Sequence, residues 1–134
     1  MGDLKKIEGI GESYAEKLKE HGISSTDSLL DTCSTPKARK EIAEKTGVSE
    51  KRILRWVNMS DLFRIKGVGE EYADLLEAAG VDTVPELAQR NVQSLVQKMT
   101  TVNEEKKLVR TVPTESSVTE WVNQAKELPR KVEY

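Results

Sequence analysis

The sequence predicts an all-α protein made of two homologous helical units, and two kinds of observation support this prediction. No stretch alternates polar and apolar residues as a half-buried strand does. In addition, the chain repeats itself: residues 7–18 return as residues 65–76, and residues 49–58 return as residues 114–123. We therefore predict a first unit at residues 1–62 and a second at residues 63–134. Because neither unit is long enough to bury much surface, we expect them to share one core.

Helix start and stop signals mark the elements of the first unit. Residues 12–21 carry apolar residues on one face and stop at Gly22, a residue typical of helix C-termini. Thr35 is a predicted N-cap, Pro36 suits the first helical position and Gly47 ends that helix. Ser49 is expected to cap the following helix. We expect about five short helices in each unit.

The second unit shows similar signals. Residues 70–79 form a helix that stops at Gly80, and Thr114 caps the last helix. Asn103 is expected to cap another helix, with the two following glutamates in its first turn. Residues 128–134 are predicted to be an extended end that packs back onto the protein.

Composition excludes several classes of function. The chain has 134 residues and a net charge of −2, from 21 basic and 23 acidic residues. Its first residues do not have the apolar core that a signal peptide has, so we expect none, and no apolar run reaches membrane-spanning length. With one cysteine (Cys33) and one histidine (His21), we expect no disulfide, no metal site and no cofactor. No nucleophile has a plausible base, so we predict a cytoplasmic protein that is not an enzyme.

Each repeat holds a Gly-x-Gly turn between two helices, at residues 9–11 and 67–69. Glycine permits positive φ, the apolar residue between the glycines can pack into the core, and the next helix begins with free amides that can hold a phosphate oxygen. These turns resemble the helix-hairpin-helix motif, and the pair resembles the tandem helix-hairpin-helix domain. Trp56-Val57-Asn58 and Trp121-Val122-Asn123 also make the whole chain similar to an uncharacterised microbial family built of two such units.

The resemblance implies binding of nucleic-acid backbone through these turns, with little sequence preference, to duplex DNA or another nucleic acid. The candidate residues are the two turns, a hydroxyl and nearby basic side chains: Lys6, Gly9, Ile10, Gly11, Ser13, Lys37, Lys40, Arg52, Lys66, Gly67, Val68 and Gly69.

Charge is distributed unequally between the units. Residues 37–55 contain seven basic and three acidic side chains, whereas residues 70–86 contain six acidic and no basic ones. Glu12 and, in the second turn, Glu70 and Glu71 stand where a phosphate would bind, and their charge opposes binding. We therefore expect the first turn to bind more strongly than the second.

An alternative is a protein-interaction or scaffolding module that keeps this fold and does not bind nucleic acid. The acidic 70–86 and basic 37–55 segments would then serve self-association or docking to another protein. For the aromatic residues we expect packing roles: both tryptophans lie in the core, and each indole N–H finds a carbonyl partner.

Overall fold

A computed structural model describes residues 3–134, and this range contains helices and no strands, which confirms the all-α prediction. Contacts divide the chain into two compact units. Unit 1 extends to Asp61 and includes Lys131–Tyr134, and unit 2 comprises Leu62–Arg130. The last four residues thus pack on unit 1, whereas the sequence repeat assigns them to the second unit.

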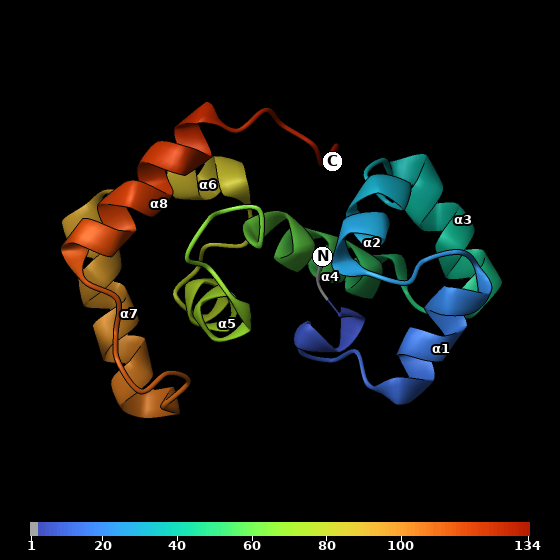
Figure 1. The fold of residues 1–134 in the computed structure, drawn as a ribbon, viewed down its shortest axis with the longest axis horizontal. Helices are drawn as coiled ribbons and strands as arrows, with labels where there is room; N and C mark the ends of the chain where they lie inside the picture. Colours follow the sequence, from blue (N-terminus) through green and yellow to red (C-terminus); the bar gives the residue numbers. More distant parts are fainter. Residues whose placement is uncertain (1–2) are drawn as a thin grey trace. The chain divides into compact units, whose positions relative to one another are not determined.

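From residue 3 onward, unit 1 contains a 3-10 helix and four α-helices, which Figure 1 shows in order along the chain. They are η1 (Leu4–Lys6), α1 (Glu12–Glu20), α2 (Thr26–Thr32), α3 (Pro36–Thr46) and α4 (Glu50–Leu62). Local chemistry sets their ends as predicted. The Thr35 side chain accepts from the Ala38 amide, Gly47 closes α3 with a φ of 76°, and the Ser49 hydroxyl accepts from the Arg52 amide at 3.2 Å.

Unit 2 repeats this order with four α-helices in its described residues. They are α5 (Glu70–Ala78), α6 (Val84–Gln89), α7 (Val92–Lys106) and α8 (Glu115–Glu127). Thr114 caps α8 as predicted, since its side chain accepts from the Ser117 amide. Helix α7 has 15 residues against 11 in α3, so part of the extra length of the second repeat extends this helix.

The prediction that Asn103 starts a helix is wrong. Helix α7 begins after Asn91, whose side chain accepts from the Ser94 amide, and Asn103 lies inside it. The Asn103 amide instead bonds both backbone groups of Val109, as donor to its oxygen at 3.0 Å and acceptor from its nitrogen at 2.9 Å. It therefore fixes the loop after α7 rather than the start of a helix.

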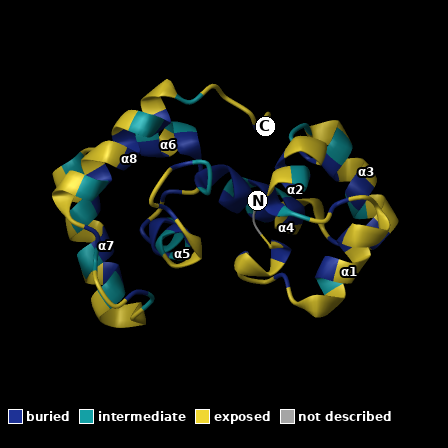
Figure 2. Ribbon diagram, viewed as in Figure 1, coloured by how far each residue is buried: buried dark blue, intermediate teal, exposed yellow. Residues whose placement is uncertain are grey.

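Apolar side chains from every element form the interior of each unit (Figure 2). Both tryptophans are buried, with 0% of Trp56 and 3% of Trp121 exposed, which confirms their packing role. Each lies against a tyrosine of its own unit: the Tyr14–Trp56 and Tyr72–Trp121 ring centroids are both 5.3 Å apart. The repeat in the sequence is thus a repeat of packing.

The C-terminal segment packs back on unit 1, as expected. Val132 is buried, and the Glu133 amide donates to the Ser34 carbonyl at 2.8 Å. The Arg39 guanidinium holds the same segment through the Glu133 carbonyl, at 2.6 Å. None of the helices described in residues 3–134 is long and apolar enough to cross a membrane.

Candidate functional site

The two glycine turns have the same backbone. Gly9 has a φ of +98° and Gly67 a φ of +97°. Residues that carry a side chain rarely adopt this backbone conformation. The apolar residue that follows each is buried, with Ile10 3% and Val68 5% exposed. The Ile10 amide donates to Ile7 and the Val68 amide to Ile65, both at 3.1 Å. As predicted, the middle residue fixes the turn by packing into the core.

The second glycine of each turn has a different character. Gly11 and Gly69 are the N-caps of α1 and α5, with negative φ and no side-chain cap. A Cβ on either would meet nothing within 4 Å. Neither backbone conformation nor crowding requires glycine here. Each helix therefore begins at an open surface where another molecule can approach the backbone closely.

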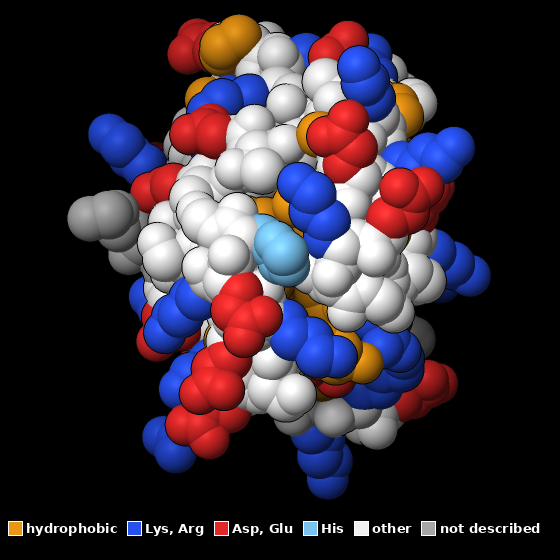
Figure 3. Space-filling view, turned by 90° about the vertical axis from the view of Figure 1, so that its right-hand side faces the viewer, with side chains coloured by type: hydrophobic (Ala, Val, Ile, Leu, Met, Phe, Trp, Pro, Cys, Tyr) orange, Lys and Arg blue, Asp and Glu red, His pale blue; other side chains and the backbone are white. Residues whose placement is uncertain are grey.

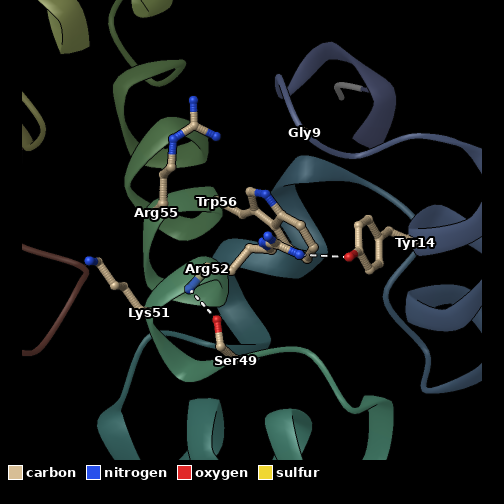
Figure 4. Close-up of a pocket in the computed structure, with 7 residues that line it drawn as sticks. All are labelled: Gly9, Tyr14, Ser49, Lys51, Arg52, Arg55 and Trp56. Carbon is tan, nitrogen blue, oxygen red and sulfur yellow. Dashed lines mark hydrogen bonds between the residues drawn. The ribbon is translucent and has the colours of Figure 1, made fainter.

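A pocket of about 590 Å³ lies next to the first turn, between the turn and α4 (Figure 4). Three cationic side chains, a hydroxyl, two aromatic rings and a glycine line it: Lys51, Arg52, Arg55, Ser49, Tyr14, Trp56 and Gly9. Among the described residues, no acidic side chain lines it. Such a pocket has the charge to receive an anion.

Specific contacts orient two of the arginines. Arg52 Nη1 donates to the Tyr14 hydroxyl at 2.6 Å, and its guanidinium carbon lies 5.5 Å from the Tyr14 ring centroid. Arg55 Nη1 donates to the Glu8 carbonyl at 2.7 Å, and its Nη2 lies 3.2 Å from the Glu8 carboxylate. Lys51 stands at the pocket's edge, pointing away from Arg52 in Figure 4. Helix α4 thus brings Arg55 to the residue before the glycine turn and Arg52 to Tyr14 of α1.

One prediction for Trp56 is wrong. Its indole nitrogen finds no carbonyl: it is buried and has no hydrogen-bond partner among the described residues. A Cβ on Gly9 would lie 3.5 Å from that nitrogen and 3.6 Å from Arg55 Nη1, so both donors converge on the glycine. An unpaired buried donor costs about 1–3 kcal/mol.

The structure brings only some of the predicted site residues together. Lys6, Ser13, Lys37 and Lys40 are exposed, but within residues 3–134 no hydrogen bond or ion pair joins Lys37 or Lys40 on α3 to the turn. Arg39 does not belong to a basic surface, because it is 5% exposed and bonds the Cys33 carbonyl at 3.0 Å. On the face around His21, cationic and acidic side chains are interspersed (Figure 3). The basic segment 37–55 is therefore not one continuous basic surface.

The sequence profile of a domain of unknown function, DUF4332, matches residues 8–128. The chain belongs to the DUF4332 family. This confirms the expected relation to an uncharacterised family. No solved structure matches the chain. The matched region of this DUF4332 chain includes both glycine turns, both tryptophans and all the residues that line the pocket.

The second turn of this DUF4332 chain has the same scaffold with different charges. The offset of 65 residues pairs the pocket cations Lys51, Arg52 and Arg55 with Ser116, Ser117 and Glu120. At the offset of 58, Glu8 corresponds to Lys66, whose backbone amide donates to the Gln124 side chain at 2.9 Å. The Tyr72 hydroxyl donates to the Thr111 carbonyl at 3.2 Å instead of meeting an arginine. At these three matched positions α8 has no cation, whereas α4 has three.

Sequence reasoning missed most of the pocket. It selected Gly9 and Arg52 but not Ser49, Lys51 or Arg55, and it assigned Tyr14 and Trp56 to packing alone. The available signal was the difference between the repeats of this DUF4332 chain, where residues needed for packing are kept and the cations are not. Within residues 3–134, no three His, Cys, Asp or Glu side chains group as a metal site requires.

Proposed function

We propose that unit 1 is a helix-hairpin-helix module that binds the sugar–phosphate backbone of nucleic acid, without sequence preference and without catalysis. Unit 2 is the second motif of the tandem arrangement and serves mainly as scaffold. Its turn, Lys66 to Gly69, has the same backbone but leads into the carboxylates Glu70 and Glu71. Like charge there opposes a phosphate.

The open N-terminus of α1 is the observation that carries the proposal. Gly11 is a glycine that the fold does not need, as its φ is −89° and a Cβ would meet nothing within 4 Å. The first bond of the helix runs from the Ala15 amide to the Gly11 carbonyl. The amides of residues 12–14 therefore point outward at the positive end of the helix, where a phosphate oxygen can accept from them.

The charges around α1 favour an anion despite Glu12. The Glu12 carboxylate lies 4.0 Å from Lys5 Nζ, and Lys6 is exposed on the same short helix. Ser13 supplies an exposed hydroxyl within the first turn of α1. The cations of α4 add to the positive field on this side of the turn. A module with so few phosphate contacts binds at about 10⁻⁴–10⁻⁶ M and loses affinity as salt rises.

Fluorescence anisotropy of labelled duplex DNA tests this proposal with the variant Gly11→Ala. The added methyl group meets no protein atom, so the fold persists, but it covers the amides. We expect affinity to fall about tenfold, because one charge-assisted hydrogen bond contributes about 1.5–3 kcal/mol. The matched control is Gly69→Ala, the same change at the other turn, which should leave affinity within about twofold.

Equal affinities for Gly11→Ala and the unmodified protein would contradict the assignment of the α1 amides. Absence of DNA binding at low salt would contradict nucleic-acid binding altogether. In that case the second candidate, a docking module for protein, gains support. It is favoured by the exposed carboxylates of Glu70, Glu71 and Asp82, which make no ion pair within residues 3–134.

A further inference from the structure

The pocket beside Gly9 is a built site that backbone binding at α1 does not use. We propose that it binds a phosphate dianion, either inorganic phosphate or the terminal phosphate of a phosphomonoester. This inference goes beyond the proposed function and does not depend on it, because the pocket donors are side chains of α4 and the α1 amides are not among them.

The charge of the pocket favours a dianion over a phosphodiester. Lys51, Arg52 and Arg55 are cationic, and no acidic side chain of residues 3–134 lines the pocket. Glu8 offsets one of the three charges through its contact with Arg55. The remaining excess of about two positive charges matches a phosphomonoester, whose second pKa is about 6, better than a diester with one negative charge.

The donors of the pocket are already oriented. The Tyr14 hydroxyl accepts one hydrogen bond from Arg52 Nη1 and so orients the guanidinium. Among the described residues, this is the one hydrogen bond that the Arg52 side chain makes. A guanidinium has five donors in a fixed plane, so a phosphate can still accept two parallel hydrogen bonds from Arg52. Ser49 adds a hydroxyl at the start of the same helix.

The indole N–H of Trp56 supplies the independent evidence for a ligand. Trp56 is 0% exposed, and its Nε1 has no partner among the described residues although a buried donor normally has one. The missing side chain of Gly9 leaves this nitrogen and Arg55 Nη1 close to the same point, at 3.5 and 3.6 Å. A small shift of Arg55 would admit an anionic oxygen that accepts from both.

The volume of the pocket indicates the size of the molecule that carries the phosphate. Pockets for small organic ligands occupy about 300–1,000 Å³, and this one occupies about 590 Å³. Inorganic phosphate would fill a small part of it. The Tyr14 ring lines the remaining space. We therefore expect a phosphomonoester of nucleotide size to bind more tightly than phosphate alone.

Comparison with unit 2 indicates that folding does not require the cations Lys51, Arg52 and Arg55. The same helix–turn scaffold is built there with Ser116, Ser117 and Glu120 at the corresponding positions. Clustered like charges on one helix also repel one another. Their presence on α4 is explained by an anion that neutralises them.

The test follows the two indole N–H resonances of the ¹⁵N-labelled full chain by NMR at constant ionic strength. Inorganic phosphate, AMP and adenosine are titrated separately. We expect the Trp56 resonance to shift saturably with phosphate and with AMP, and neither resonance to shift with adenosine. Trp121 is the internal control, since the pocket residues lie in the other unit. A 5′-phosphorylated oligonucleotide compared with its 5′-hydroxyl form shows whether a chain end can supply the phosphate.

Matched variants make the assignment specific. The double variant Lys51→Gln with Arg52→Gln should weaken phosphate binding about tenfold. The control Lys37→Gln with Lys40→Gln makes an equal charge change on α3 and should alter phosphate binding less than about twofold.

Glu8→Gln should strengthen phosphate binding, because it removes the carboxylate that competes for Arg55. Gly11→Ala should leave phosphate binding intact even where it weakens DNA binding. An unmoved Trp56 resonance at about 10 mM phosphate, or equal losses in the two double variants, would overturn the inference.

Discussion

Trp121 occupies the space that a side chain on Gly67 would need: a Cβ there would lie 2.9 Å from the indole Nε1. The corresponding distance from Gly9 to Trp56 Nε1 is 3.5 Å, an ordinary contact. The two turns share their backbone conformation, so unit 2 packs its tryptophan closer to the glycine. The turn of unit 1 keeps the looser arrangement beside the pocket.

This difference predicts unequal effects of alanine at the two turns. Both Gly9→Ala and Gly67→Ala place a side chain at a φ near +98°, which costs about 1–3 kcal/mol. Gly67→Ala also forces the buried Trp121 to move, and such overpacking costs about 1–3 kcal/mol more. We expect Gly67→Ala to lower the free energy of unfolding, measured in urea, by the larger amount.

Gly11→Ala and Gly69→Ala are the controls for this prediction. Both positions have negative φ and open space, so only a weaker N-cap is lost, which costs about 1 kcal/mol or less. Equal losses for Gly67→Ala and Gly69→Ala would show that the close approach of Trp121 does not constrain the second turn.

Sequence reasoning succeeded where local chemistry decides the structure. Thr35 and Gly47 bound α3 as predicted, because a cap depends on residues within one turn of the helix. Asn103 failed because asparagine followed by glutamates has the same pattern at an N-cap and inside a helix. The fold of the loop after α7 brings the Val109 backbone to Asn103, so the Asn103 side chain bonds Val109 rather than capping a helix.

The pocket could not be predicted in this way, because it depends on which cations the fold exposes. Arg39 and Arg52 have similar charged neighbours in the sequence, yet Arg39 is buried against backbone carbonyls and Arg52 lines the pocket. The count of charges along residues 37–55 includes both arginines, although only Arg52 is among the predicted site residues. The contacts of each side chain separate a structural arginine from a candidate binding residue.

Arg39 joins two distant segments of unit 1, which predicts a local effect of its removal. Its guanidinium donates to the Cys33 carbonyl at 3.0 Å and to the Glu133 carbonyl at 2.6 Å. Arg39→Ala should cost about 3–6 kcal/mol, since it deletes two charge-assisted hydrogen bonds of about 1.5–3 kcal/mol each. It should also release residues 131–134, so hydrogen exchange at the Glu133 amide, which bonds the Ser34 carbonyl, should accelerate.

Arg110→Ala is a suitable control for Arg39→Ala, because Arg110 is exposed and lies in unit 2. It should leave exchange at Glu133 unchanged. Exchange that stays slow in Arg39→Ala would mean that Val132 and the Ser34 bond hold the C-terminal segment without the arginine.

Cys33 predicts how stability changes at alkaline pH. Burial raises the pKa of its thiol from 9.0 to about 11, although the nearby Arg39 guanidinium lowers it in part. The folded state therefore keeps a proton that the unfolded state loses above pH 9. This contribution to stability is fully present below about pH 9 and is lost as pH rises through about 11, and two pKa units correspond to about 3 kcal/mol at most.

Urea unfolding of the unmodified protein and of Cys33→Ala between pH 8 and 11 measures this contribution, because the other titrating groups are common to both proteins. We expect the stability advantage of the unmodified protein to shrink as pH rises. An advantage that stays constant would mean that the thiol ionises equally in both states.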